Sequence, residues 1–199
     1  MPRHPRLSLL VLTVPRRVRT YFPRLVGSLC AQADDYKGQV EVLALFDNRT
    51  RTIGTKRNAL LDLAVGDYVA FIDDDDRVAM DFVRQVLVAL DAHPGVDLVL
   101  YDAVVERPGR PDCLCRYDVT MEKPVFDPEP WRNYLGPPAH HHVWRAGLAK
   151  QFRFPDRNTG EDFAWTLAAR TRVATWCYVH KSLYFYNYNI LTSESARRD

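Results

Sequence analysis

Short apolar runs alternate with segments of helical periodicity through the first half of the chain, and this alternation constrains the fold more than any other feature. The apolar runs cover residues 7–14, 39–46, 68–72 and 96–105. Each run has the length and composition of a strand that is buried on both faces. Strands that alternate with helices in this rhythm predict a parallel sheet covered by helices on both faces, which is a doubly wound α/β fold.

The segments between these runs carry apolar residues at helical spacing. Residues 18–33 are expected to form the first helix. A second helix is expected to be capped by Thr55 and to end before Gly66, because hydroxyl residues favour helix starts and glycine favours helix ends. A third helix is expected to begin at Val78 and to stop at His93, where a His-Pro-Gly sequence breaks the pattern.

The second half of the chain has a different character. Seven of the 13 prolines lie between Pro108 and Pro138, which predicts loops and short edge strands there. A helix is expected over residues 161–172 and an aromatic strand over residues 174–188. The polar end of the chain, residues 193–199, is expected to be frayed.

Composition indicates one soluble domain. The chain has 199 residues, of which 47% are hydrophobic and 26% charged, the balance of a globular protein. No apolar run reaches the about 18 residues that a membrane span needs. The basic opening MPRHPR precedes a short apolar run without a cleavage site, so we expect no signal peptide and a cytoplasmic protein. The net charge of +2 is too small to indicate a nucleic-acid-binding protein by itself, although arginine outnumbers lysine by 22 to 5.

The cysteines do not form a metal-binding pattern. They are Cys30, Cys113, Cys115 and Cys177, and only the middle two lie close together in sequence. No second pair stands at the spacing of a zinc site, so we expect reduced thiols.

Four consecutive aspartates, Asp73 to Asp76, directly follow the third apolar run. In an open parallel sheet, ligands bind beyond the carboxyl ends of the strands, which is where this run falls. Adjacent carboxylates repel one another unless a cation compensates them, and they suit Mg²⁺ or Mn²⁺ shared with substrate phosphates. An EF-hand is excluded, because Arg77 and Val78 stand where a ligand and the invariant glycine should be. The alternative is a solvated acidic turn.

Two further motifs carry charged side chains at expected helix starts. Residues 54–58 read Gly-Thr-Lys-Arg-Asn, and the backbone N–H groups of a helix start with two cations make an anion site suited to phosphates. The pattern of a P-loop is absent, and the alternative is an ordinary basic surface. Glu161 and Asp162 follow Gly160 at the last helix, where they are either helix caps or the source of a general base.

Taken in order, these motifs resemble the family 2 glycosyltransferases of the GT-A fold. The resemblance covers about residues 7–195 and rests on G-x-K-R-N, G-D-Y-V-A-F-I-D-D-D-D, G-E-D and L-Y-x-Y. It implies a GT-A (nucleotide-diphospho-sugar transferase) fold, with a Rossmann-like, mostly parallel central sheet and helices on both faces. It also implies a single domain over residues 1–199, with a nucleotide-sugar-binding half (1–106) and an acceptor-binding half (107–199).

The resemblance implies roles for individual residues. The donor-binding residues that it implies are Thr13, Asp47, Lys56, Arg57, Asp73 and Asp74. Among them, Thr13 would lie beneath the base, Asp47 would contact the uracil, and Asp73 or Asp74 would bind the ribose. The late E-D pair would supply the catalytic residues, with Asp162 as the base and Glu161 on the acceptor.

The resemblance also implies a divalent metal, Mn²⁺ or Mg²⁺, on Asp75, with His180 as a second ligand or else a structural histidine. The run His140-His141-His142 could bind metal, but three consecutive residues do not face one ion in regular structure, which favours an acceptor-site or loop role. Trp131 and Tyr134 are expected in the proline-rich loop, where they could stack on a sugar or a base.

The sequence departs from the family pattern at three points. Val14-Pro15-Arg16 replaces the usual Tyr-Asn pair after the first strand, and Asn48 replaces a second acid after the second strand. The Q-x-x-R-W motif of processive synthases is absent. A single-transfer enzyme is therefore favoured over a polymerase.

The expected function is that of a metal-dependent, inverting glycosyltransferase, which moves a sugar from a UDP-sugar or related donor to a hydroxyl on a glycan or small molecule. The arginines of the second half also allow a hydroxylated base in nucleic acid as acceptor; they are Arg107, Arg110, Arg116 and Arg132. A nucleotidyltransferase should carry a Gly-rich loop after the first strand, which is missing here. A non-catalytic acidic binding module would have no use for the late E-D pair.

Overall fold

The computed structural model describes residues 4–128 and 132–188. Its strands are β1 (Leu7–Thr13), β2 (Val40–Phe46), β3 (Tyr68–Asp73), β4 (Arg77–Val78), β5 (Leu98–Glu106), β6 (Cys113–Tyr117), β7 (Val125–Phe126), β8 (Asn133–Gly136), β9 (Val143–Arg145) and β10 (Trp176–Asn187). Its helices are α1 (Tyr21–Asp34), α2 (Ile53–Leu63), α3 (Phe82–Ala92), α4 (Ala146–Ala149) and α5 (Glu161–Arg170).

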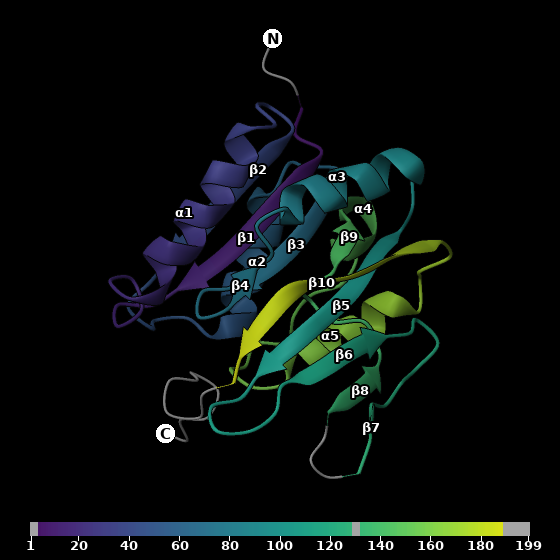
Figure 1. The fold of residues 1–199 in the computed structure, drawn as a ribbon. Helices are drawn as coiled ribbons and strands as arrows, with labels where there is room; N and C mark the ends of the chain where they lie inside the picture. The colour runs from purple at the N-terminus through teal and green to yellow at the C-terminus, as the bar shows by residue number, and fades with distance from the viewer. Residues whose placement is uncertain (1–3, 129–131, 189–199) are drawn as a thin grey trace.

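All the described strands join one sheet, whose main path runs β2-β1-β3-β9-β5-β6-β8-β7 (Figure 1). β1 pairs in parallel with β2 and β3, and β10 pairs in parallel with β5. The short β9 runs antiparallel between β3 and β5. Every residue of β1 is buried, as its continuous apolar sequence predicts. The expected mixed α/β fold with a mostly parallel central sheet is confirmed.

Helices cover both faces of the sheet (Figure 1). α1 packs against α3 on one face, and α2 packs against α5 on the other. The α1–α3 contact includes Gln32, whose side-chain amide donates to the carbonyl of Ala79 and accepts from the backbone N–H of Val83. The two helical layers and the buried strands between them form one hydrophobic core.

Several expected element boundaries are wrong. Thr52, not Thr55, caps α2: its hydroxyl accepts from the backbone N–H of Thr55. Val78 lies in β4 rather than in α3, because it pairs with Tyr184 of β10. α2 ends at Leu63, before Gly66 as expected, but Gly66 is not its cap; a Cβ at Gly66 would lie 2.6 Å from Ser8 Oγ, so this position needs glycine for close packing against β1.

The proline-rich segment forms short strands at the far end of the sheet, as expected. β6 pairs with β5, β8 pairs with β6, and β7 pairs with β8. The sequence did not indicate β9 or α4, which are only three and four residues long. Trp131 and residues 193–199 lie outside the described residues.

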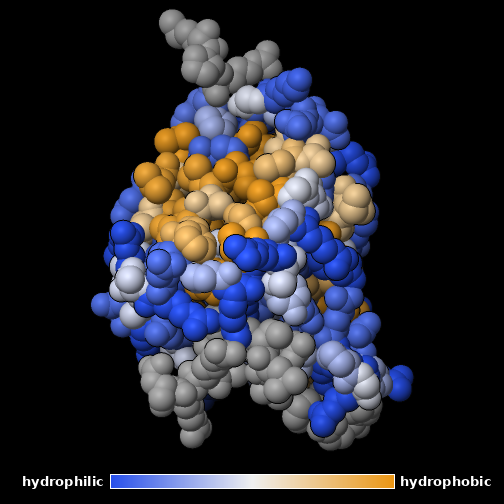
Figure 2. Space-filling view, turned by 90° about the vertical axis from the view of Figure 1, so that its left-hand side faces the viewer, coloured by the Kyte–Doolittle hydropathy of each residue, from blue (hydrophilic) through white to orange (hydrophobic). Residues whose placement is uncertain are grey.

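The opposite end of the sheet is formed by β2, and its neighbourhood is apolar. Figure 2 shows apolar residues gathered on this side of the molecule. Phe46, Leu63 and Val65 expose 53%, 63% and 52% of their surfaces, and the other apolar residues of β2 are half-buried or exposed. None of the helices in the described parts of the chain has the length and hydropathy to cross a membrane.

Candidate active site

A cleft of about 920 Å³ opens at the carboxyl ends of β1 and β3. Thr13 is the last residue of β1 and Asp73 the last of β3, so these two strands deliver polar side chains to the same edge. Side chains from β5, β6 and β10 line the cleft as well, together with the loop before β9 and the first turn of α5. Ligands of open α/β sheets bind at this edge.

The middle two aspartates of the acidic run are held by Arg17. Its Nη1 lies 2.7 Å from Asp74 Oδ1 and its Nη2 lies 2.7 Å from Asp75 Oδ2. The hydroxyl of Thr13 donates to the other oxygen of Asp74 at 2.7 Å, so Thr13 and Asp74 are both buried in this contact. Burial, which Arg17 only partly offsets, and the neighbouring carboxylates Asp73 and Asp74 raise the pKa of Asp75 to about 6.

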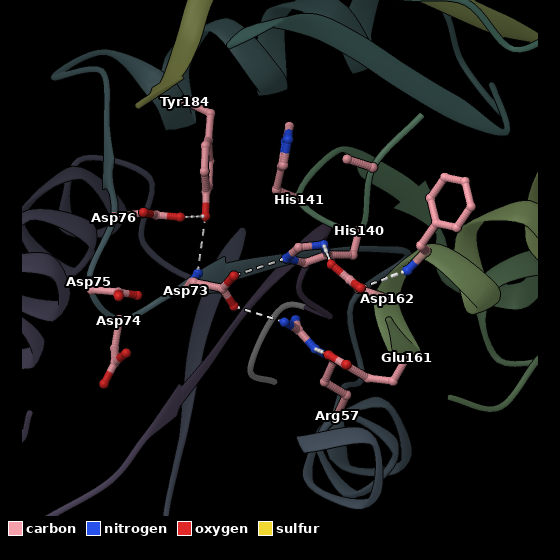
Figure 3. Close-up of polar contacts among 12 residues, drawn as sticks. Arg57, Asp73, Asp74, Asp75, Asp76, His140, His141, Glu161, Asp162 and Tyr184 are labelled. Atoms are coloured by element: carbon pink, nitrogen blue, oxygen red, sulfur yellow. Dashed lines mark hydrogen bonds and ion pairs between the residues drawn. The ribbon is translucent and has the colours of Figure 1, made fainter. Parts of the chain in front are cut away.

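The last aspartate of the run, Asp76, ties the acidic turn to β10. One of its oxygens accepts from the hydroxyl of Tyr184 and the other from the backbone N–H of Asn187. Burial, reinforced by the charges of Asp73 and Asp75, raises the pKa of Asp76 well above its usual range. The hydroxyl of Tyr184 also accepts from the backbone N–H of Asp73, so this tyrosine of the L-Y-x-Y motif fixes the turn from above (Figure 3).

Arg57 of α2 joins the acidic run to α5. Its Nη2 lies 2.9 Å from Asp73 Oδ1 and its Nε lies 3.3 Å from Glu161 Oε1. The guanidinium lies 5.2 Å from the ring centre of Phe71 and 5.7 Å from that of Phe154. Arg57 is 4% exposed, and its Nη1 has no hydrogen-bond partner among the described residues.

His140 lies between the acidic run and the first turn of α5 (Figure 3). Its Nε2 is 3.3 Å from Asp73 Oδ2 and its Nδ1 is 3.4 Å from Asp162 Oδ2. Burial and the charge of Arg57 would lower the pKa of His140, but Asp73 and Asp162 outweigh them and raise it to about 9. The imidazole is therefore charged at neutral pH.

The two acids of α5 have different environments. Glu161 is 4% exposed and faces Arg57, and burial raises its pKa. The Asp162 side chain is 38% exposed. Burial would raise the pKa of Asp162, but His140 and Arg57 hold it below its usual range. Gly160 precedes them at a φ of 67°, a left-handed backbone that favours glycine. Asp162 is thus the accessible carboxylate of the pair.

The start of α2 is not an anion site, which corrects the expectation for residues 54–58. The backbone N–H of Ile53 donates to the side chain of Asn158, and that of Gly54 donates to the carbonyl of Arg157. The next two N–H groups donate to the side chain and the carbonyl of Thr52. The loop before α5 therefore covers this helix end, and no N–H group of the first turn is left for a phosphate.

Asp47 and Lys56 form an ion pair of 3.1 Å, and only Lys56 lines the cleft. Asp47 also accepts from the backbone N–H groups of Arg49 and Arg51, so it organises the loop after β2. Burial would raise the pKa of Asp47, but Lys56 and these N–H groups lower it.

The remaining expected site residues separate into two groups. His180 is exposed and stacks on Tyr178 at 4.7 Å, outside the cleft, so the structure does not bring it together with Asp75. His141 lines the cleft and stacks on Tyr184 at 4.2 Å. Tyr134 lines the cleft beside Phe126, with 5.2 Å between the ring centres.

A divalent metal fits this site only if substrate phosphates supply some of its ligands. In the described parts of the chain, no group of three or more His, Cys, Asp or Glu side chains is arranged to hold a metal ion. The raised pKa of Asp75 shows that Arg17 does not fully compensate the crowded carboxylates. Mg²⁺ is commonly bound by one or two carboxylates plus substrate phosphates, and Asp75 suits that mode.

Two site residues were not assigned from the sequence. Arg17 lies in a loop and carried no motif in a chain with many arginines. His140 belonged to a noted histidine run, but nothing in that run distinguished it from His142, which is fully buried. Burial lowers the pKa of His142 to about 3, and its Nε2 lies 3.2 Å from the carbonyl of Tyr101, so it is structural.

Comparison with known proteins agrees with this architecture. Residues 27–114 match the sequence profile of glycosyl transferase family 2. The structure is similar to Staphylococcus aureus TarS 1-349, with a TM-score of 0.64 and 18% identity over 92% of this chain and 60% of that one. A second structure of that protein, with UDP-GlcNAc, gives the same TM-score and identity over 59% of its length.

A third similar structure is glucosyl-3-phosphoglycerate synthase from Mycobacterium tuberculosis, in complex with Mn²⁺, UDP-glucose and phosphoglyceric acid. Its TM-score is 0.62, with 14% identity over 94% of this chain and 73% of that one. No curated protein matches this sequence significantly.

The chain has the mixed α/β fold of these similar structures, the GT-A fold. The resemblance to family 2 is confirmed for residues 27–114, which the profile matches. The chain spans about 60% of the TarS 1-349 structure and 37% of the longer TarS structure.

Proposed function

We propose that this chain transfers a sugar from a UDP-sugar to an acceptor hydroxyl with inversion at the anomeric carbon. The observation that carries the proposal is the position of Asp162, an accessible carboxylate in the same cleft as Asp73 and Arg57. The two similar proteins were solved with UDP-GlcNAc and UDP-glucose, which supports this class of donor.

The donor is assigned to residues 1–106 and the acceptor to residues 107–199. On the donor side, the unpartnered Nη1 of Arg57 supplies an N–H donor for a diphosphate oxygen, and Lys56 adds a positive charge to the same wall. Both stabilise the negative charge that develops as the nucleoside diphosphate leaves. Asp73 is the carboxylate for the ribose, since Thr13 and Arg17 bury Asp74.

Asp162 acts as the general base. The acceptor oxygen forms a bond to the anomeric carbon while the bond from that carbon to the diphosphate oxygen breaks. The acceptor proton passes to Asp162, and the nucleoside diphosphate leaves with the electron pair. A single in-line displacement of this kind inverts the configuration.

A divalent ion, Mn²⁺ or Mg²⁺, is part of the proposal as a companion of the donor. Asp75 would hold it, and it would supply positive charge to the diphosphate oxygens. The glucosyl-3-phosphoglycerate synthase structure, which contains Mn²⁺ and UDP-glucose, supports this assignment. The four cysteines are free thiols, which agrees with the proposed cytoplasmic location.

The acceptor wall favours a second candidate acceptor besides a glycan. Tyr134, Tyr186 and Tyr188 line the cleft on this side, together with Arg107 and Arg110. Aromatic rings and arginines suit an acceptor with flat rings and negative charge, such as a nucleic acid with a hydroxylated base. Binding of single-stranded DNA that weakens steeply between low and physiological salt supports this acceptor, and no binding at low salt excludes it.

The function is tested by incubating the protein with a panel of UDP-sugars and Mn²⁺ and measuring UDP release and product mass. Asp162→Asn should bind UDP as the wild type does and lose about 10²–10⁴ in turnover, the usual worth of a general base. If Asp162 is only a helix cap, asparagine caps equally well and the rate stays unchanged. Glu161→Gln is the matched control: a collapse there with a near-normal Asp162→Asn rate moves the base to Glu161.

A further inference from the structure

We propose that His140 is a positioning residue that orients the base Asp162 and couples it to the donor carboxylate Asp73. The inference rests on the proposed function and adds a residue to it. His140 touches neither substrate in this assignment. It acts through the two carboxylates on either side of its ring, one from each half of the cleft.

The geometry supports this role. The two ring nitrogens of His140 point in different directions, Nε2 toward Asp73 and Nδ1 toward Asp162 (Figure 3). Asp73 ends β3, and Asp162 lies on the first turn of α5, which are 89 residues apart along the chain. A single buried ring, 8% exposed, therefore links two elements that the sequence separates widely.

The second oxygen of Asp162 is also fixed. Its Oδ1 accepts from the backbone N–H of Phe163 at 2.8 Å, while His140 faces Oδ2. A carboxylate held at both oxygens has one orientation of its plane, and Asp162 lines the cleft in that orientation. Orientation of this kind is what a base needs to meet an acceptor hydroxyl in line with the anomeric carbon.

The surroundings of His140 define what it can respond to. The charged and titratable groups that face it are Asp73, Asp162, Glu161, Arg57, His141 and His142. Arg57 repels the imidazolium but binds Asp73 from the other side. Asp73 thus receives two cationic partners, and a donor that engages Asp73 or Arg57 shifts the balance of charge at His140. The electrostatic environment of His140 therefore changes when a donor binds, while its Nδ1 keeps the base Asp162 in position.

Two variants separate the two contacts. The amide N–H of asparagine replaces the N–H of Nδ1, so His140→Asn keeps the contact with Asp162 and loses that with Asp73. Glutamine is longer and replaces Nε2, so His140→Gln keeps Asp73 and loses Asp162. Hydrogen bonds to charged groups are worth about 10- to 100-fold in an equilibrium or a rate, which sets the size of the effect.

We expect His140→Asn to raise the KM for the UDP-sugar about 10-fold with kcat nearly unchanged, and His140→Gln to lower kcat about 10- to 100-fold with KM nearly unchanged. Such a split cannot come from a general loss of structure. Equal losses in both variants, or no change in either, would overturn the inference. His93→Gln, an exposed histidine at the end of α3, is the matched control and should change neither constant.

A measurement on the wild-type protein keeps the inference testable if the variants do not fold. The imidazole nitrogen NMR signals of His140 should shift when UDP and the diamagnetic ion Mg²⁺ are added, because the donor engages its neighbours. Unchanged signals at saturating UDP would refute the coupling. Turnover that depends on Asp162 but not on His140 refutes this inference alone, whereas absence of turnover with every UDP-sugar refutes the proposed function.

Discussion

At the scale of single residues, the acidic run is a set of four carboxylates with four different tasks. Asp73 faces Arg57 and His140, Asp74 is buried by Thr13 and Arg17, and Asp76 anchors β10. Asp75 faces Arg17. Burial, together with crowding by Asp73 and Asp74, raises the pKa of Asp75 to about 6. The position within the run, and not the residue type, decides which carboxylate is available to a ligand.

A bound metal ion should therefore restore part of the stability that is lost when Arg17 is removed. Arg17→Ala removes the cation from the buried Asp74 and the half-buried Asp75, and breaking a buried pair costs about 3–5 kcal/mol of unfolding free energy. We expect added Mn²⁺ to raise the melting temperature of Arg17→Ala more than that of the wild type. Arg19→Ala, at an exposed position of the same loop, should stay within about 0.5 kcal/mol of the wild type. Equal responses to Mn²⁺ in all three proteins would contradict this assignment.

The charge on His140 predicts a pH dependence of stability. The folded-state pKa of His140, about 9, lies above the usual 6.5. The charged imidazole therefore contributes fully to the free energy of unfolding below pH 6.5, and this contribution is lost as the pH rises through 9. The contribution is at most about 3 kcal/mol. The stability difference between wild type and His140→Gln should shrink over this range, as measured by urea unfolding at a series of pH values. A constant difference from pH 6 to pH 10 would contradict the charged state.

At the scale of elements, the G-x-K-R-N motif joins α2 to the loop that leads into α5. Asn58 donates to the carbonyl of Phe154 and accepts from its backbone N–H, both at 2.9 Å. Thr52 and Thr55 both donate to Asp156. The motif places Arg57 against Glu161 by holding the two elements together, so its glycine and asparagine have structural tasks.

Gly54→Ala tests this junction. A Cβ at Gly54 would lie 1.8 Å from the carbonyl oxygen of Pro155, so the loop before α5 must move. We expect a loss of about 2 kcal/mol or more in unfolding free energy, measured by chemical denaturation. Gly27→Ala is the matched control: its added Cβ meets no atom within 4 Å on the surface of α1, and alanine should stabilise that helix by about 0.5–1 kcal/mol. Two equal and small effects would mean that the contact with Pro155 is not required.

The elements that the sequence predicted correctly are those whose signal is local. The buried strands leave continuous apolar runs, and α5 follows directly on its acidic start. β9 and α4 are too short to carry any periodicity. The contacts of Arg17 with Asp74 and of His140 with Asp73 join residues 57 and 67 positions apart, so only the folded sheet brings them together.

At the scale of the whole molecule, the edge strands at the two ends of the sheet differ in length. The proline-rich end finishes in β7, which has two residues, while β2 forms the other end with seven residues and apolar side chains around it. A strand at a sheet edge presents backbone groups that can pair with another chain. The apolar side chains next to β2 make such pairing more favourable.

Ala44→Lys should reduce self-association without affecting the fold. Ala44 is exposed in β2, and lysine on an edge strand opposes pairing with a second strand. We expect a change in unfolding free energy within about 0.5 kcal/mol and slower aggregation at equal protein concentration, measured by light scattering. Val88→Lys, on the exposed side of α3, adds the same charge away from the edge and should leave aggregation unchanged. Equal slowing by both variants would assign the effect to net charge.

The bridge from Asp73 through His140 to Asp162 has a thermodynamic consequence for the order of events in the cleft. In the proposed function the donor acts on Asp73 and the acceptor on Asp162, and His140 contacts both carboxylates. Occupancy by one ligand therefore changes the free energy of binding the other. Linkage requires the effect to be reciprocal: the factor by which a donor changes acceptor affinity equals the factor by which an acceptor changes donor affinity. Where that factor favours binding, the ternary complex is more stable than the two binary complexes predict, which limits hydrolysis of the donor by water.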